Sequence, residues 1–118
     1  MIYRPRGILD QDEIDRIVAF LDAEEDRADS AFNRFTDTSK LDAVDLTFQL
    51  VFRVSLHRRL VYSNRPPVKS ALYVTSPATA RIAKLHAMLT DHSPLHVKMF
   101  EDLATAAKWL DVSIEDLE

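Results

Sequence analysis

Strand-length apolar runs that alternate with longer amphipathic segments are the feature that most constrains the fold. The runs at residues 32–37, 68–74 and 95–100 are each followed or preceded by segments whose apolar residues recur at helical spacing. Because parallel strands need a crossover connection, this alternation predicts a mainly parallel sheet. The nearly continuous apolar run at 68–74 suits a central strand, whereas the half-polar run at 95–100 suits an edge.

One domain is expected for residues 1–118. The length, with 47% hydrophobic and 29% charged residues, is typical of one compact core, and no linker or repeat divides the chain. The fold class predicted is α/β: a single small domain with a four-to-five-stranded, mainly parallel sheet and helices on both faces.

The N-terminal half begins with a predicted short edge strand through residues 1–9, interrupted by Pro5. Asp10 followed by Glu13 has the spacing of a capping box, and it predicts a helix from about residue 11 to residue 26.

Residues 41–62 contain neither proline nor glycine and are rich in Val, Leu and Phe, so we predict one long, largely buried helix. Its apolar residues fall on two stripes: Val44, Phe48, Val51 and Ser55, and Leu50, Val54 and His57. Two stripes indicate packing on more than one side, and the second surface is a candidate dimer contact.

Ser76 and Pro77 form the clearest local signal, because serine suits the N-cap of a helix and proline its first position. A last helix is predicted at residues 103–110, capped by Glu101 or Asp102, before a short acidic tail from residue 111.

Two shortages in composition exclude whole classes of site. Gly7 is the only glycine, so the chain has no glycine-rich loop for a dinucleotide or a nucleotide phosphate, and no nucleophile elbow. There is no cysteine, which removes thiolate nucleophiles, disulfides and thiolate zinc sites. The four histidines form no H-x-x-x-H pair on a predicted helix. We therefore expect no cofactor and no metal.

Charge and hydropathy bound the partners. A formal net charge of −4 gives no general attraction to nucleic acid, and no apolar run approaches the roughly 20 residues of a membrane span. The N-terminus has no apolar leader segment. We expect a cytoplasmic protein that binds no nucleic acid and does not insert into membranes.

Two groups of charged residues are candidate binding surfaces. The acidic run comprises Asp22, Glu24, Glu25 and Asp26, and the basic cluster comprises His57, Arg58, Arg59, Arg65 and Lys69. The acidic run is interpreted as a solvated helix face. The basic cluster either holds an acidic partner or a phosphate, or merely offsets a helix macrodipole. His86 and Trp109 are expected to pack against apolar neighbours.

Short polar side chains follow the predicted strands at their carboxyl ends, where ligands bind in open parallel sheets. The candidates for a ligand site are Asp37, Thr38, Ser39, Thr75, Ser76 and Glu101. The alternative is that they supply only turn and capping interactions, which these residue types provide in many proteins.

Several short motifs resemble the SpoIIAA-like, STAS-type proteins. They are residues 68–74 (VKSALYV), Ser76-Pro77, Arg81, residues 96–102 (HVKMFED) and residues 106–110 (AAKWL). Members of that family often have a helix opened near Ser-Pro, a strand ending in Phe plus an acidic pair, and a final helix ending in Ala-x-x-Trp-Leu. The likeness extends more weakly over the first half of the chain.

The resemblance implies a STAS-like fold and a non-catalytic regulator that binds partner proteins and sometimes nucleotides. Some such regulators are phosphorylated on a serine that follows an aspartate at the start of a helix. The nearest counterpart here is Asp45-Leu46-Thr47, with Leu46 in place of the serine. Thr47 is then a phosphorylation candidate, and the alternative is a plain threonine inside an amphipathic helix.

The leading hypothesis is thus a non-enzymatic, STAS-like binding or regulatory domain with a protein partner or a second copy of itself as a homodimer. The alternative is a carrier that holds a small-molecule or lipid-type ligand at the carboxyl ends of the strands. A third hypothesis, an enzyme that uses Asp37 with His92 or His96, requires these distant positions to meet.

Overall fold

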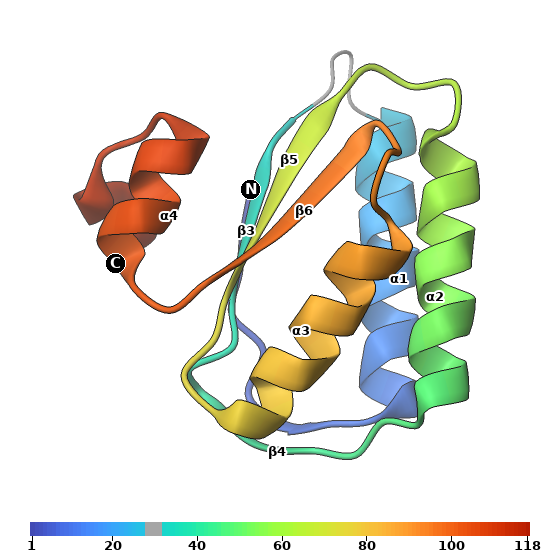
Figure 1. Cartoon of the computed structure of the whole chain (residues 1–118), viewed down its shortest axis with the longest axis horizontal. Coiled ribbons are helices and arrows are strands. Elements are labelled where there is room, and N and C mark those ends of the chain that lie inside the picture. The colour runs from blue at the N-terminus through green and yellow to red at the C-terminus, as the bar shows by residue number, and fades with distance from the viewer. Residues whose placement is uncertain (28–31) are drawn as a thin grey trace.

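A four-stranded sheet, parallel throughout, lies at the centre of the molecule (Figure 1). The computed structural model describes residues 1–27 and 32–118. The strand order is β1 (Ile2–Tyr3), β3 (Arg34–Asp37), β5 (Val68–Tyr73) and β6 (Leu95–Phe100). The prediction of a central strand near residues 68–74 and an edge strand near 95–100 is therefore confirmed.

A second, two-stranded parallel sheet is formed by β2 (Gly7–Leu9) and β4 (Leu41–Val44). The strand predicted at residues 1–9 is thus divided between two sheets, β1 at the edge of the large one and β2 in the small one, on either side of Pro5. Gly7 has φ +76, a left-handed conformation that favours glycine.

Helices cover both faces of the large sheet, as predicted (Figure 1). Three pack on one face: α1 (Gln11–Arg27), α2 (Phe48–Tyr62) and α3 (Pro77–Leu89). The opposite face carries α4 (Leu103–Leu110) and the 3-10 helix η1 (Ile114–Leu117). None of the helices in the described residues is long and apolar enough to cross a membrane.

The prediction of one helix over residues 41–62 is wrong. Residues 41–44 form β4, because the backbone of β2 offers them a parallel partner and tertiary pairing overrides local propensity. Thr47 then starts α2 as its N-cap, with Oγ1 accepting a hydrogen bond from the Leu50 amide at 3.1 Å. Phe48, predicted on a buried stripe, is 60% exposed.

The remaining helix starts agree with the sequence. Ser76 is the N-cap of α3 with Pro77 in the first turn, and Asp102 is the N-cap of α4. The Asp10 carboxylate accepts a hydrogen bond from the Glu13 amide at 3.0 Å at the start of α1. Each cap satisfies an amide that the helix leaves without a partner.

The core between the large sheet and α4 is tightly filled. Phe35, Ala71 and Phe100 from the strands meet Ala106 and Ala107, and all five are buried. The alanines let α4 approach the sheet closely, and aromatic rings fill the remaining space. The predicted acidic tail also contributes here, because η1 buries Leu117 in the same core.

The other face of the sheet is lined differently, since alternate residues of each strand point to opposite faces. Arg34 and Thr36 of β3 and Ser70 of β5 lie toward the three helices. Thr36 and Ser70 are much smaller than the phenylalanines on the opposite face. A cavity lies on this side of the sheet.

Trp109→Ala should destabilise the domain by about 2 to 3 kcal/mol. The Trp109 ring packs against the α4 core, 5.4 Å from the Phe100 ring, and Lys69 Nζ lies 5.4 Å from its centroid. Urea denaturation measures the loss, with Trp109→Phe as the control that keeps most of the contact. A loss below about 1 kcal/mol would show that Trp109 does not seal this core.

Candidate functional site

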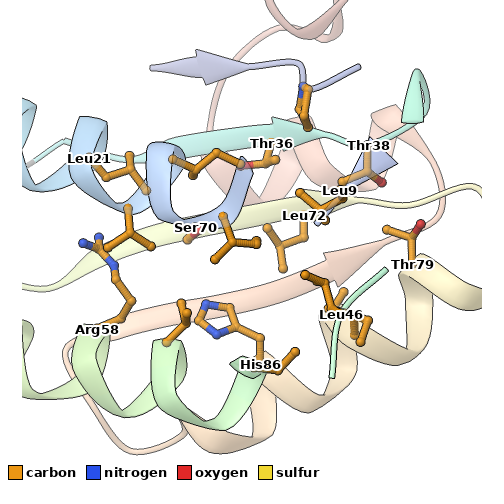
Figure 2. A pocket seen from close by; sticks show the side chains of 18 of the residues that line it. Leu9, Leu21, Thr36, Thr38, Leu46, Arg58, Ser70, Leu72, Thr79 and His86 are labelled. Atoms are coloured by element: carbon orange, nitrogen blue, oxygen red, sulfur yellow. The ribbon is translucent and has the colours of Figure 1, made fainter. Parts of the chain in front are cut away.

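A cavity of about 160 Å³ lies between the large sheet and the layer of helices (Figure 2). Its lining is mostly apolar. The apolar side chains are Pro5, Leu9, Ile14, Ile17, Val18, Leu21, Leu46, Leu50, Val51, Val54, Leu72, Val74, Ile82, Ala83 and Leu95. Because α1, α2 and α3 all contribute their apolar faces, the cavity replaces part of the core that these faces would otherwise form.

The polar lining consists of donors and hydroxyls. The residues are Arg34, Thr36, Thr38, Arg58, Ser70, Thr79 and His86. No carboxylate and no side-chain amide stands among the described residues of the wall. Thr38 Oγ1 donates to the Tyr73 carbonyl at 2.6 Å, and Thr79 Oγ1 pairs with Ser76 Oγ at 2.8 Å. These two hydroxyls are therefore already engaged.

His86 projects from α3 into the space between the helices and the sheet (Figure 2). Its Nδ1 lies 2.7 Å from Ser55 Oγ on α2. Burial lowers the pKa of His86 from 6.5 to about 4, with a smaller contribution from the positive charge of Arg58. The imidazole is therefore neutral near neutral pH.

A serine and a histidine at hydrogen-bond distance also form the pair that nucleophilic catalysis uses. Here the serine is Ser55, which is fully enclosed at 0% exposure and does not line the cavity. A molecule in the cavity therefore has no approach to Ser55 Oγ. The hydrogen bond orients the His86 ring.

A buried ionic cluster closes one end of the cavity. Glu25 of α1 accepts hydrogen bonds from Arg34 of β3 at 2.7 Å and from Arg58 of α2, and each of the three side chains is 4% exposed. Arg58 also donates to Asp22 at 2.8 Å, and Arg65 donates to Glu25 at 3.2 Å. The carboxylates of α1 thus neutralise the arginines that reach the cavity.

Glu25 stays ionised in this cluster. Burial raises the pKa of Glu25, but the charge of Arg58 and hydrogen bonds from Arg58, Tyr62 and Arg34 together outweigh burial, so the pKa lies below its ordinary value. The interpretation of the acidic run as a solvated helix face is therefore wrong for Glu25. It enters the interior because three arginines surround it.

The basic cluster of the sequence is also divided by the structure. Arg58 and Arg65 pair with the acidic side chains of α1, whereas Arg59 donates to the Asp91 carbonyl. Arg34 completes the ionic cluster, stacking over the rings of Phe32 and Tyr62 and donating to the Tyr62 hydroxyl. Most of these cations therefore already have partners within the chain.

The candidates Asp37, Thr38 and Ser39 lie at the carboxyl end of β3, as predicted. Asp37 accepts from the Ser39 amide at 2.9 Å and lies 3.5 Å from Arg4. Of the three, Thr38 lines the cavity. The short turn is held by its own hydrogen bonds, and a ligand role for Asp37 and Ser39 stays a prediction.

Thr75, Ser76 and Glu101 lie just beyond β5 and β6 at the same edge of the sheet, and all three are exposed. Ser76 Oγ accepts from the Thr79 amide as the cap of α3. They share the edge with Asp37 because the parallel strands end together in the row Asp37, Tyr73 and Phe100. Their ligand role also stays a prediction.

Thr47 is exposed, and it caps α2 instead of lying inside a helix. Its hydroxyl oxygen already accepts from the Leu50 amide. Phosphorylation of Thr47 stays a prediction.

The residues of the enzyme hypothesis do not meet. His92 and His96 lie before and within the first half of β6, near the amino edge of the sheet, whereas Asp37 ends β3 at the carboxyl edge. Within residues 1–27 and 32–118, no group of three or more His, Asp or Glu side chains has the arrangement of a metal site.

The cavity and its polar groups were missed by reasoning from the sequence. His86 was expected to pack on an apolar face, which it does, but the space beside it has no sequence signal. One sign was available: Arg58 continues the buried stripe of Val51 and Ser55 on α2. A charged residue within an apolar stripe indicates a buried ionic or binding group.

Stability should fall between about pH 6.5 and pH 4 because of His86. The folded chain holds the His86 pKa near 4 against 6.5, so the unfolded chain binds the proton first and acid favours unfolding. Urea denaturation at about pH 7 and about pH 4.5 should show a loss of roughly 2 kcal/mol that is absent in His86→Leu. An equal loss in both proteins would assign it to other groups.

Comparison with known proteins agrees with this architecture. A solved structure with a similar fold is that of an uncharacterized protein of the DUF3478 family from Shewanella loihica PV-4, described as having a SpoIIAA-like fold. The two chains are 16% identical with a TM-score of 0.54, and the match covers 92% of this chain and 81% of the other. No protein-family model and no curated protein matches the sequence. The resemblance inferred from the motifs is confirmed at the level of architecture: the chain has a SpoIIAA-like fold.

Proposed function

We propose that this is a non-enzymatic binding domain that holds a small, mainly apolar molecule in the cavity between its sheet and its three-helix layer. The observation that carries the proposal is a cavity of about 160 Å³ walled by the apolar faces of three helices. The cavity favours the carrier hypothesis over a purely regulatory role. The ligand then lies between the sheet and the helices and not at the carboxyl ends of the strands. Thr38 belongs to both sites, because it is one of the predicted residues and also lines the cavity.

Packing energetics support a ligand. Protein interiors are normally packed without voids of this size, and an empty apolar cavity costs roughly 24 cal/mol per Å³. Occupation by an apolar molecule recovers dispersion contacts that the wall otherwise lacks. An engineered apolar cavity of roughly 150 Å³ takes up benzene, so a ring of that size suits the present one.

Ala83 gives the direct test, since it lines the cavity from α3 and is 5% exposed. Ala83→Leu places three further carbons in the space and should weaken benzene binding by at least about tenfold relative to the unmodified chain. Ligand-observed NMR measures the binding. Ala78→Leu on the exposed side of the same helix is the matched control. Benzene binding that Ala83→Leu leaves intact would locate the site elsewhere, and no binding to the unmodified chain would refute the proposal.

A second candidate function, self-association, rests on a separate observation. Phe48, Phe52, Leu56 and Leu60 recur every four residues along α2 and are 47% to 64% exposed. They form one apolar ridge, which we name the α2 ridge. Contiguous exposed apolar surface of this kind marks an interaction site.

The α2 ridge is complementary to a second copy of itself. In an antiparallel pair of α2 helices, Phe48 faces Leu60 of the other copy and Phe52 faces Leu56, so each large ring meets a smaller side chain. Such i to i+4 ridges interdigitate in the commonest class of helix packing, and a two-fold axis generates both halves of the contact. Of the neighbouring cations, Arg53 has the Asp15 carboxylate 3.7 Å away, which offsets its charge, and the Arg59 guanidinium is held at the Asp91 carbonyl.

Sedimentation equilibrium tests the dimer. The chain should sediment as a dimer at the highest soluble concentration, and Phe52→Glu should convert it to a monomer by burying a charge in the contact. Lys84→Glu, an exposed change on α3, should leave the dimer intact. A monomer at every concentration would exclude this candidate without touching the cavity.

The cytoplasmic location, the protein partner and the regulatory role expected from the sequence remain part of the proposal. A regulatory role would couple occupation of the cavity to the α2 ridge. Helix α2 belongs to both, because Leu50, Val51 and Val54 line the cavity and the ridge lies on the exposed side of the same helix.

A further inference from the structure

The His86 ring offers a polar group to the cavity, and its chemistry narrows the kind of ligand. Of the side-chain N and O atoms that the described residues fully enclose, Arg34 Nε is the one without a hydrogen-bond partner. His86 Nε2 has no hydrogen-bond partner in the described part of the chain and is not among these fully enclosed atoms, so it remains accessible, and its ring lies in the wall of the cavity (Figure 2). Its other nitrogen, Nδ1, is held by Ser55.

Ser55 fixes which nitrogen carries the proton. Its hydroxyl is fully buried and has one proton to donate. Among the described residues, the partner within hydrogen-bond distance of Ser55 Oγ is His86 Nδ1 at 2.7 Å. A buried hydroxyl normally donates its proton, so Nδ1 accepts, and the neutral ring carries its own proton on Nε2. His86 consequently presents an N–H donor to the cavity.

The other polar groups of the cavity wall are also mainly hydrogen-bond donors. Arg34 and Arg58 can only donate, the hydroxyls of Thr36 and Ser70 can donate or accept, and no described carboxylate or amide oxygen lines the space. Net charge gives no further attraction for an ion, because Glu25 and Asp22 already pair with the two arginines.

We propose that the ligand of this cavity is an uncharged, mainly apolar molecule with one hydrogen-bond acceptor oxygen, of the ketone, aldehyde or ester type, bound to His86 Nε2. This inference rests on the proposed function, since it names the ligand class of the same site. His86 is the specificity-determining residue, and Ser55 is the residue that positions it. A hydrocarbon of equal shape fits the same walls but leaves the Nε2 proton without a partner, which is unfavourable in a low-dielectric interior.

Cyclohexanone and methylenecyclohexane form a matched pair of probes, because they share one ring and differ in C=O against C=CH2. The dissociation constants of both are measured by ligand-observed NMR for the unmodified chain and for His86→Leu. The ketone should lose about tenfold more affinity than the hydrocarbon on substitution, as a neutral hydrogen bond is worth roughly 1.4 kcal/mol. The comparison cancels the different hydration of the two probes.

A second readout uses the unmodified chain alone, so that it holds even if His86→Leu fails to fold. Cyclohexanone should shift the ¹⁵N resonance of His86 Nε2, and methylenecyclohexane should not. Both probes could bind, lose equal affinity on His86→Leu, and have the same effect on the ¹⁵N resonance of His86 Nε2. In that case the acceptor inference is wrong and the proposed apolar site stands. If neither probe binds and benzene also fails, the proposed function itself is wrong and the inference falls with it.

Discussion

The carboxylate of Glu25 is the contact on which the helix layer depends. It leaves water almost completely, at 4% exposure, and burial of an ion is unfavourable by several kcal/mol unless charged partners surround it. Three arginines do so: Arg34 from β3, Arg58 from α2 and Arg65 from the loop after α2. Whereas the side chain of Glu25 is buried, the apolar residues of α1 are at most half-buried, so α1 is held by its half-buried apolar face and by this cluster. Without the cluster, the wall that α1 gives to the cavity would be held by the half-buried apolar face alone.

Local features of the fold were predictable because their causes are local. Ser76 with Pro77, and Asp102, start helices by satisfying free amides within a few residues. The strand near residues 68–74 follows from its own apolar run. The division of residues 41–62 into β4 and α2 was not predictable in this way, because Leu41–Val44 become a strand only through pairing with Gly7–Leu9, more than thirty residues earlier. Pairing between distant segments leaves no trace in the propensity of either one.

The same distinction separates the predicted site from the observed cavity. Asp37, Thr38 and Thr75 could be placed at one edge of the sheet because polar residues after strands form a local pattern. A cavity, in contrast, depends on volumes contributed by four or more segments. Thr36 and Ser70 face Ala83 and His86 across the layer, and each apolar helix face taken alone predicts an ordinary filled core. The acidic run and the basic cluster were likewise interpreted as separate surfaces, although Glu25 and Arg58 bind each other in the interior.

Burial accounts for both properties of His86 that matter here. Desolvation keeps its imidazole neutral, with a pKa near 4, so the ring offers a single donor without bringing an unpaired positive charge beside Arg58. The enclosed hydroxyl of Ser55 fixes the direction of that donor. A charged histidine would favour a carboxylate on the ligand, whereas a neutral one with its proton on Nε2 selects for an acceptor oxygen alone. The ionic cluster at one end and the neutral donor beside it thus favour an uncharged ligand, because every cation that reaches the cavity already has its counter-ion within the chain.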